Sequence, residues 1–262
     1  MFTTCWDESR AACIPKVQCS TVRLTRNLPW PMGYTAAISK VLDDASVPNF
    51  IWGDVLNAIW GSAILPVSLG YIVPRDALET AISAIEKAGL PRCSCEESLH
   101  HAQPDNVLSL PVHFSVPTFC GVDLVYLCTH DLFIDLIPLT PRHPNPAGLE
   151  CIQAKVNFRN PDFRLEGEED DMHVLNVLTG PSLKALLLLL AALSPDNRRG
   201  FIFTFEYTLW MLHQDGKTLE NPKSHSLEGY WVFMCNVMDG ILTDRVLAVQ
   251  QVEAEWREKL RL

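Results

Sequence analysis

The fold of this chain is constrained most by the segment at residues 50–74, which reads FIWGDVLNAIWGSAILPVSLGYIVP. After a short apolar run, Gly53 permits a tight turn, and apolar residues then recur at helical spacing up to Trp60. Pro66 keeps the following residues out of a helix, and the apolar run 67–73 is typical of a buried strand. The segment therefore predicts a strand, a glycine turn, a short helix and a second strand, in that order.

Apolar patterns on both sides of this segment predict further helices and strands. Helical spacing indicates a helix at residues 34–42 and another at 78–85, with Asp76 as the cap of the second. Short apolar runs bounded by turn residues predict additional strands of the same sheet at 112–114, 122–127 and 133–137.

The pattern becomes helical after Thr179. Residues 183–193 are apolar nearly all round, which indicates a buried helix. This run is too short for a membrane span, which needs about 20 residues, so we predict no membrane partner. Three more helices are predicted at 201–213, 229–239 and 243–260.

These patterns together predict an α+β fold organised in three parts. Residues 1–32 form an N-terminal arm with no sustained period. Residues 33–150 form an α/β core, in which helices flank a mixed sheet, and residues 151–262 form a mainly helical C-terminal part.

Composition and charge restrict the compartment and the partners. A chain of 262 residues with 48% apolar composition can bury a large core. The net charge of −10 repels a phosphate backbone, which disfavours nucleic acid as a partner. Nine scattered cysteines indicate a reducing compartment, and the first residues lack the basic and apolar regions of a secretory signal. We therefore expect a cytoplasmic or nuclear protein.

The central segment resembles the opening of the nucleotidyltransferase fold, the DNA polymerase β-like superfamily, and in particular small fungal proteins of that type. Their WGE-like turn reads Trp52-Gly53-Asp54 here, their GVP-like step reads Gly61-Ser62-Ala63, and their VPD-like strand end reads Val73-Pro74-Arg75. The resemblance covers roughly residues 47–139 and, more loosely, the helical part after Thr179. It implies a nucleotidyltransferase-like mixed sheet with a nucleotide cleft.

The resemblance also implies where metal-binding acids would lie. Active members hold the nucleotide triphosphate at the glycine turn, and two carboxylates at positions i and i+2 of the next strand share metal ions with it. Alternate residues of a strand face the same way, so such a pair can serve two metals roughly 3.5–4 Å apart. Here Ser68 and Gly70 fall nearest those positions, and neither is an acid. A serine hydroxyl does not replace two anionic ligands of Mg²⁺.

The two acids that remain are separated in the sequence. Asp123 matches the third carboxylate of the superfamily, and Asp54 lies at the glycine turn. The interpretation we favour has no metal ligand and no cofactor; the alternative is that Asp54 and Asp123 bind Mg²⁺ or a nucleotide in an altered way. Asp54 could instead cap its helix, and Asp123 could end a strand at the surface.

The resemblance brings a set of candidate ligand-binding residues to the cleft. They are Trp52, Gly53, Asp54, Ser62, Ser68, His113 and Asp123. His113 is included because the fungal relatives often show a histidine followed by an aromatic residue there. Its alternative role is that of a buried imidazole bonded to backbone.

A second group of residues could bind zinc. Cys93, Cys95, His100 and His101 place two thiols and two imidazoles within nine residues. Structural zinc sites usually separate their cysteines by two to four residues, so a loop with reduced thiols is the favoured interpretation. The common hydrolase, NTPase, dinucleotide and HExxH motifs do not occur in the sequence.

Two functional hypotheses follow from these observations. In the first, the protein has a nucleotidyltransferase-like fold without metal-dependent transfer, and it binds a nucleotide, a small-molecule ligand or a protein partner, the last through a Trp-rich and Met-rich helical face. In the second, it is a divergent enzyme that uses the same cleft for other chemistry, such as an accessory step in fungal secondary metabolism. The absence of the acid pair favours the first, and the two together leave open whether the chain is an enzyme.

Overall fold

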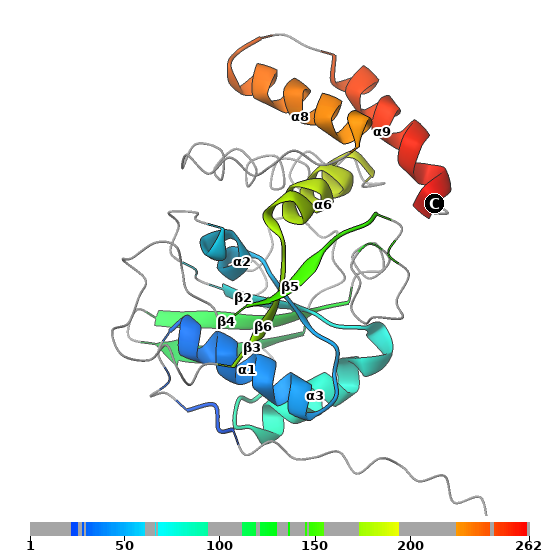
Figure 1. Ribbon diagram of the computed structural model, residues 1–262. Coiled ribbons are helices and arrows are strands. Elements are labelled where there is room, and N and C mark those ends of the chain that lie inside the picture. Colours follow the sequence, from blue (N-terminus) through cyan, green and yellow to red (C-terminus); the bar gives the residue numbers. More distant parts are fainter. Residues whose placement is uncertain are drawn as a thin grey trace, which may run out of the picture.

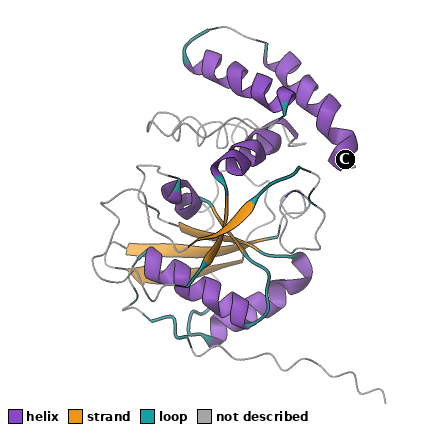
Figure 2. Cartoon of the chain, in the orientation of Figure 1, coloured by secondary structure: helices purple, strands orange, loops and turns teal. Residues whose placement is uncertain are grey.

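The computed structural model describes residues 22–25, 28, 30–60, 66, 68–93, 112–118, 121–129, 136, 145, 147–154, 173–193, 224–241 and 244–260. They form an α+β fold (Figures 1 and 2). The helices are α1 (Met32–Asp44), α2 (Asp54–Ile59), α3 (Leu78–Lys87), α6 (Gly180–Leu193), α8 (His225–Met238) and α9 (Arg245–Leu260), with a 3₁₀ turn, η2, at Arg75–Ala77. The strands are β1 (Phe50–Trp52), β2 (Ser68–Ile72), β3 (Val112–Thr118), β4 (Gly121–Cys128), β5 (Cys151–Ala154) and β6 (Leu175–Leu178).

The first four strands form a mixed sheet in the order β1-β2-β4-β3. β1 is antiparallel to β2, β2 is parallel to β4, and β3 and β4 are an antiparallel pair. The predicted mixed sheet is therefore confirmed, as is the strand, glycine turn, helix and strand of the central segment.

Helices cover both sides of this sheet (Figure 1). α1 and α3 lie on one side, where the hydroxyl of Tyr71 on β2 donates to the carbonyl oxygen of Thr35 on α1 at 2.8 Å. α2 and α6 lie on the other side, which carries the alternate residues of each strand. The two sides therefore have different neighbours, and this difference positions the candidate site.

Two local predictions are wrong. Asp76 does not cap α3, because η2 moves the helix start to Leu78, and the residue before it, Ala77, makes no side-chain cap bond. In the predicted strand 133–137 only Leu136 is described, and it is helical and fully buried. The predicted arm 1–32 lies mostly outside the described residues, as does the predicted helix 201–213.

The C-terminal part is built on α6, which lies between the sheet and the α8–α9 pair (Figure 1). Every side chain of α6 except that of Pro181 is buried, which confirms the predicted buried helix. α8 and α9 confirm the helices predicted at 229–239 and 243–260. α8 begins earlier than predicted, because the hydroxyl of Ser224 accepts a bond from the amide of Leu227 and caps it.

A second, two-stranded sheet was not predicted. β5 and β6 are antiparallel, and β6 lies beside β1, where the side-chain amide of Asn176 donates to the carbonyl oxygen of Asn49 at 3.2 Å. The indole nitrogen of Trp60, at the end of α2, donates to the carbonyl oxygen of Leu178 at 3.1 Å. These bonds attach the small sheet to the central segment.

None of the helices in the described ranges has both the length and the apolar character that crossing a bilayer requires.

Candidate functional site

Four residues from four strands stand in one row across the main sheet. Trp52 pairs with Gly70, Gly70 with Tyr126, and Tyr126 with His113. Directly paired residues share one side of a sheet. We call this set, Trp52, Gly70, Tyr126 and His113, the central row. It lies on the side opposite Tyr71, and it contains two of the predicted ligand-binding residues.

The side chain of Tyr126 fills the space beside two glycines. A Cβ atom on Gly70 would lie 2.5 Å from the phenol oxygen of Tyr126, and one on Gly53 would lie at the same 2.5 Å. Gly53 also has a φ of +75°, a conformation that favours glycine. The glycine turn, to which the resemblance assigns a triphosphate, is therefore in contact with the protein's own phenol.

The phenol of Tyr126 stays protonated at ordinary pH. Burial raises the pKa of Tyr126 far above its usual value, and the nearby charge of Asp54 raises it further. Tyr126 is therefore a neutral group of the core.

Asp54 ties the glycine turn to the start of β2. Its Oδ2 atom accepts from the backbone amide of Ser68 at 3.2 Å and from the hydroxyl of Ser68 at 2.8 Å. The alternative that Asp54 caps its own helix is wrong, because the N-cap of α2 is Gly53. The carboxylate at the turn thus bonds the serine that stands nearest the first acid position.

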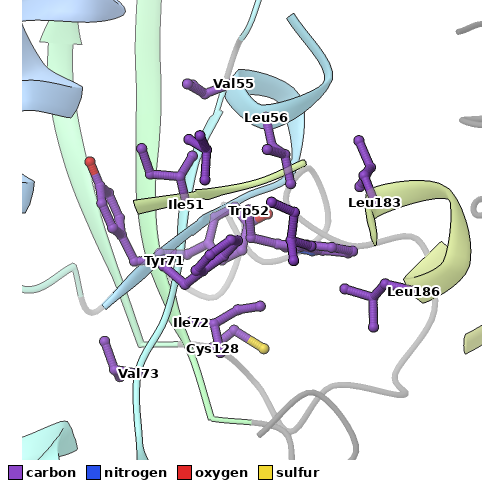
Figure 3. Packing of buried hydrophobic residues seen from close by; sticks show 14 of the residues in the cluster. Ile51, Trp52, Val55, Leu56, Tyr71, Ile72, Val73, Cys128, Leu183 and Leu186 are labelled. Atoms are coloured by element: carbon purple, nitrogen blue, oxygen red, sulfur yellow. The ribbon is translucent and has the colours of Figure 1, made fainter. Parts of the chain in front are cut away.

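Trp52 belongs to the hydrophobic core. Its side chain is only 7% exposed, and Figure 3 shows it lying toward Leu183 and Leu186 of α6, whereas Tyr71 points the other way. An indole enclosed by apolar side chains packs β1 against α6. The structure therefore places this predicted ligand-binding residue in the contact between the sheet and the C-terminal part.

His113 is buried at the edge of the sheet. It is 6% exposed, and within the described part of the chain its Nε2 atom has no hydrogen-bond partner. Its carbonyl oxygen accepts from the backbone amide of Cys93 at 3.0 Å. The imidazole thus stands between Tyr126 on one side and the strand-like segment at Cys93 on the other.

The remaining predicted site residues do not join this group. Ser68 pairs with Leu124, and Asp123 is the residue just before Leu124 on β4, where it pairs with Val116. Because successive residues of a strand face opposite sides of the sheet, the positions of Asp123 and Ser68 belong to opposite sides. Ser62 lies outside the described residues, as do Cys95, His100 and His101 of the predicted zinc group.

Sequence analysis did not identify Tyr126, which is the central side chain of the site. The signal that could have found it is the pair of glycines, since two glycines facing one space leave room for a large neighbour. Across the described ranges, no group of three or more His, Cys, Asp or Glu side chains is placed to hold a metal ion.

The C-terminal helices expose apolar side chains of a different kind from those predicted. Trp256 and Met234 are buried, and Trp231 is partly buried, with the ammonium of Lys184 3.9 Å from its ring centre. The large side chains therefore pack inside. One exposed apolar side chain, Val232, lies in the middle of α8, and four others come from the end of α8 and the start of α9. We call these four, Val237, Ile241, Val246 and Leu247, the turn surface.

No protein-family model matches this chain, and no curated protein is detectably similar to it in sequence.

Proposed function

We propose that this protein has a nucleotidyltransferase-like fold and acts by binding, without metal-dependent nucleotidyl transfer. The observation that carries the proposal is the position of Tyr126 against Gly53 and Gly70. In an active member of that superfamily, the glycine turn and the acid pair surround the triphosphate and its metal ions. In this chain a neutral phenol fills that space.

The two acid positions support the same conclusion in different ways. Gly70 has no space for a carboxylate, because even a Cβ atom would meet Tyr126 and the backbone oxygen of Trp52. Ser68 is already bonded through its hydroxyl to Asp54. A two-metal centre needs several anionic oxygens on one side of the strand. Among the described residues around the glycine turn and the start of β2, the carboxylate shown is that of Asp54, which is already bonded to Ser68.

The test of the proposal is a transfer assay combined with calorimetry. The full chain is incubated with ATP, CTP, GTP or UTP in Mg²⁺ and then in Mn²⁺, and each nucleotide is also titrated into the protein. We expect no pyrophosphate release and no binding heat. Pyrophosphate release would overturn the proposal, whereas binding heat without release would identify the ligand as a nucleotide.

The turn surface favours a protein as the binding partner. Val246 is 63% exposed and Leu247 is 55% exposed, beside Ile241 at 54%. Asp239 and Asp244 are exposed next to them, and the whole chain carries a net charge of −10. Apolar side chains beside carboxylates suit a partner segment that combines apolar and basic residues. We therefore propose a basic protein segment as the occupant.

Site-specific photocrosslinking tests this surface. A photoreactive amino acid replaces Leu247 in one form of the full chain and Gln251, an exposed polar residue of α9, in a matched control. In cells that produce the chain, we expect a discrete crosslinked species from position 247 that is absent from position 251, and its partner should be a basic protein. Equal crosslinking from both positions would contradict the proposal.

A further inference from the structure

β5 has an outer edge beside which no other described strand lies. It pairs with β6 on one side only, because the small sheet consists of these two strands. The outer strands of the main sheet differ in this respect. β1 has β6 as a neighbour, and on β3 the carbonyl oxygen of His113 accepts from the amide of Cys93 at 3.0 Å. The outer edge of β5 is therefore a place where a further strand could bind.

The hydrogen-bond pattern determines which backbone groups of β5 point outward. The amide of Thr179 donates to the carbonyl oxygen of Glu150 at 3.0 Å, which makes these two a hydrogen-bonded pair in the register of β5 and β6. Hydrogen-bonded and non-hydrogen-bonded pairs alternate along an antiparallel ladder. Cys151 and Gln153 therefore belong to non-hydrogen-bonded pairs, and their amide and carbonyl groups point away from β6.

The side chain of Asn145 marks where the open part of this edge begins. Its Nδ2 atom donates to the carbonyl oxygen of Leu149 at 2.8 Å, and its Oδ1 atom accepts from the amide of Leu149 at 2.8 Å. The side-chain amide thus bonds to Leu149 as a residue of a paired strand would. For Cys151 and Gln153, no residue of the described ranges bonds the outward groups. The edge is therefore fixed at Leu149 and open from Cys151 to Gln153.

The side chains of the open edge lack the features that protect a strand from pairing. Cys151, Ile152 and Gln153 are exposed, and they include no charge and no proline. Ile152 is 44% exposed, although its partner on β6, Val177, is buried. Native proteins usually protect an exposed edge with charged residues or proline. An uncharged edge with an exposed isoleucine is instead suited to strand addition.

We infer that β5 pairs with β5 of a second copy of the chain, antiparallel, with the two-fold axis at Ile152. Each Cys151 then faces Gln153 of the partner subunit and exchanges both backbone bonds with it, and the two Ile152 side chains meet between these pairs. An axis at Cys151 would instead place Gln153 against Leu149, whose backbone groups Asn145 already occupies. The axis at Ile152 uses the amide and carbonyl groups of both open residues.

Charge and size define the kind of dimer expected. The net charge of −10 makes two copies repel each other, but in this register exposed Glu150 stands opposite position 154 of the partner and not opposite its own copy. β5 is only four residues long, and small interfaces are typical of transient association. We therefore expect a reversible dimer. The inference is independent of the proposed binding function, because it uses neither the glycine turn nor the turn surface.

Analytical ultracentrifugation of the full chain tests the association. At physiological ionic strength, the average mass should rise from that of a monomer toward that of a dimer between about 1 µM and about 1 mM. Ile152→Lys sets two like charges against each other, and Gln153→Pro removes an outward amide without touching the bonds to β6, so each should remain monomeric. Ile241→Lys is the matched control, because it changes an exposed isoleucine of the turn surface, and it should still dimerise.

Disulfide crosslinking tests the register. In a chain that carries Cys151→Ser, either Ile152→Cys or Gln153→Cys is introduced, and disulfides formed by mild oxidation are mapped by mass spectrometry. The two Cα atoms at position 152 should lie about 4.5 Å apart, within the range of a disulfide. Those at position 153 should lie about 8 Å apart or more, beyond that range. We expect a disulfide between the two copies of position 152 and at least about tenfold less at position 153.

Four results would overturn the inference. The chain could stay monomeric at every concentration, as it would if another protein were the occupant of the edge. The dimer could persist in both Ile152→Lys and Gln153→Pro, each shown by circular dichroism to be folded. The two cysteine positions could crosslink equally. Ile241→Lys alone could abolish association, which would place the contact at the turn surface.

Discussion

The phenol of Tyr126 occupies the space that a side chain on Gly70 would need. A Cβ atom on Gly70 would lie 2.5 Å from both the phenol oxygen and the ring carbon that bears it. Because β2 and β4 are adjacent and parallel, neither backbone can move aside without breaking ladder bonds. The position of Tyr126 therefore requires a residue without a side chain at position 70.

Gly70→Ala is expected to destabilise the protein by about 1–3 kcal/mol, the usual cost of an overpacked core. Denaturant unfolding followed by circular dichroism measures the change. Gly229→Ala is the matched control: Gly229 lies inside α8, and its nearest neighbour to an added Cβ is 3.5 Å away. Alanine is the better helix former, so that change should stabilise by up to about 1 kcal/mol. If Gly70→Ala left the free energy of unfolding unchanged, Tyr126 would not lie against β2.

The pair Ser68→Asp with Gly70→Asp places two acids where active nucleotidyltransferases would have them. We expect this variant not to fold, because the second carboxylate meets Tyr126 and two like charges stand close together. Thermal unfolding with and without Mn²⁺ is the measurement. A cooperative transition whose midpoint temperature rises with Mn²⁺ would contradict this expectation. It would show that a metal site can be rebuilt and that the side chain of Tyr126 can move away from Gly70.

Asp54→Ala removes the acceptor of both bonds from Ser68 and should cost about 1.5–3 kcal/mol, the range for hydrogen bonds to a charged group. Ser68→Ala keeps the amide bond and should cost less. A double-mutant cycle should therefore give a coupling energy of about 0.5–3 kcal/mol. Asp76→Ala is the control: Asp76 is exposed and caps nothing, so its removal should change stability by no more than about 0.5 kcal/mol. If the losses of stability from Asp54→Ala and Ser68→Ala were additive in the double variant, the hydrogen bond between the two side chains would be contradicted.

Lys184 gives the stability a distinct pH dependence. Burial lowers the pKa of Lys184 to about 8, whereas an unfolded lysine titrates near about 10.4. Between these values the unfolded chain binds more protons than the folded one, so the contribution of Lys184 to stability becomes more favourable as pH rises. Below about pH 8 the buried amine of Lys184 is charged, and this buried charge destabilises the folded state.

Lys184→Met should therefore stabilise the protein near pH 7 by about 2 kcal/mol, after allowance for the lost contact with the Trp231 ring. The gain should shrink as pH approaches 10. Denaturant unfolding of both proteins at a series of pH values measures the difference, and exposed Lys87→Met is the control. A gain that is constant with pH would exclude titration of Lys184 as its cause.

Local patterns predicted the parts of the fold that depend on neighbours in the chain. The order from Phe50 to Ile72 follows from one apolar run, one glycine and one proline, and the fully apolar α6 follows from its composition. β5 and β6 were missed because each is only four residues long and their pairing joins positions 151–154 to 175–178. Short strands with distant partners carry little signal of their own.

The candidate site could be predicted only in outline, because its geometry depends on register. Spacing alone brings Gly53, Asp54 and Ser68 near one another, and the structure joins the last two. The alignment of β2 with β4, which are more than 50 residues apart in the chain, decides two features of the site. It pairs Tyr126 with Gly70, and it assigns Asp123 to the opposite side of the sheet. A shift of one residue would exchange the two sides, and nothing in the local pattern fixes it.

The burial of α6 on nearly all sides has a consequence for how this chain can evolve. The sheet covers one part of its surface, through Trp52, and the α8–α9 pair covers another. A recombination event that carried only the sheet, or only the last two helices, into another protein would leave a bare apolar helix in water or an uncovered sheet face. The sheet and its helical cover are therefore expected to be inherited together, with sequence drift confined to surfaces that α6 does not touch.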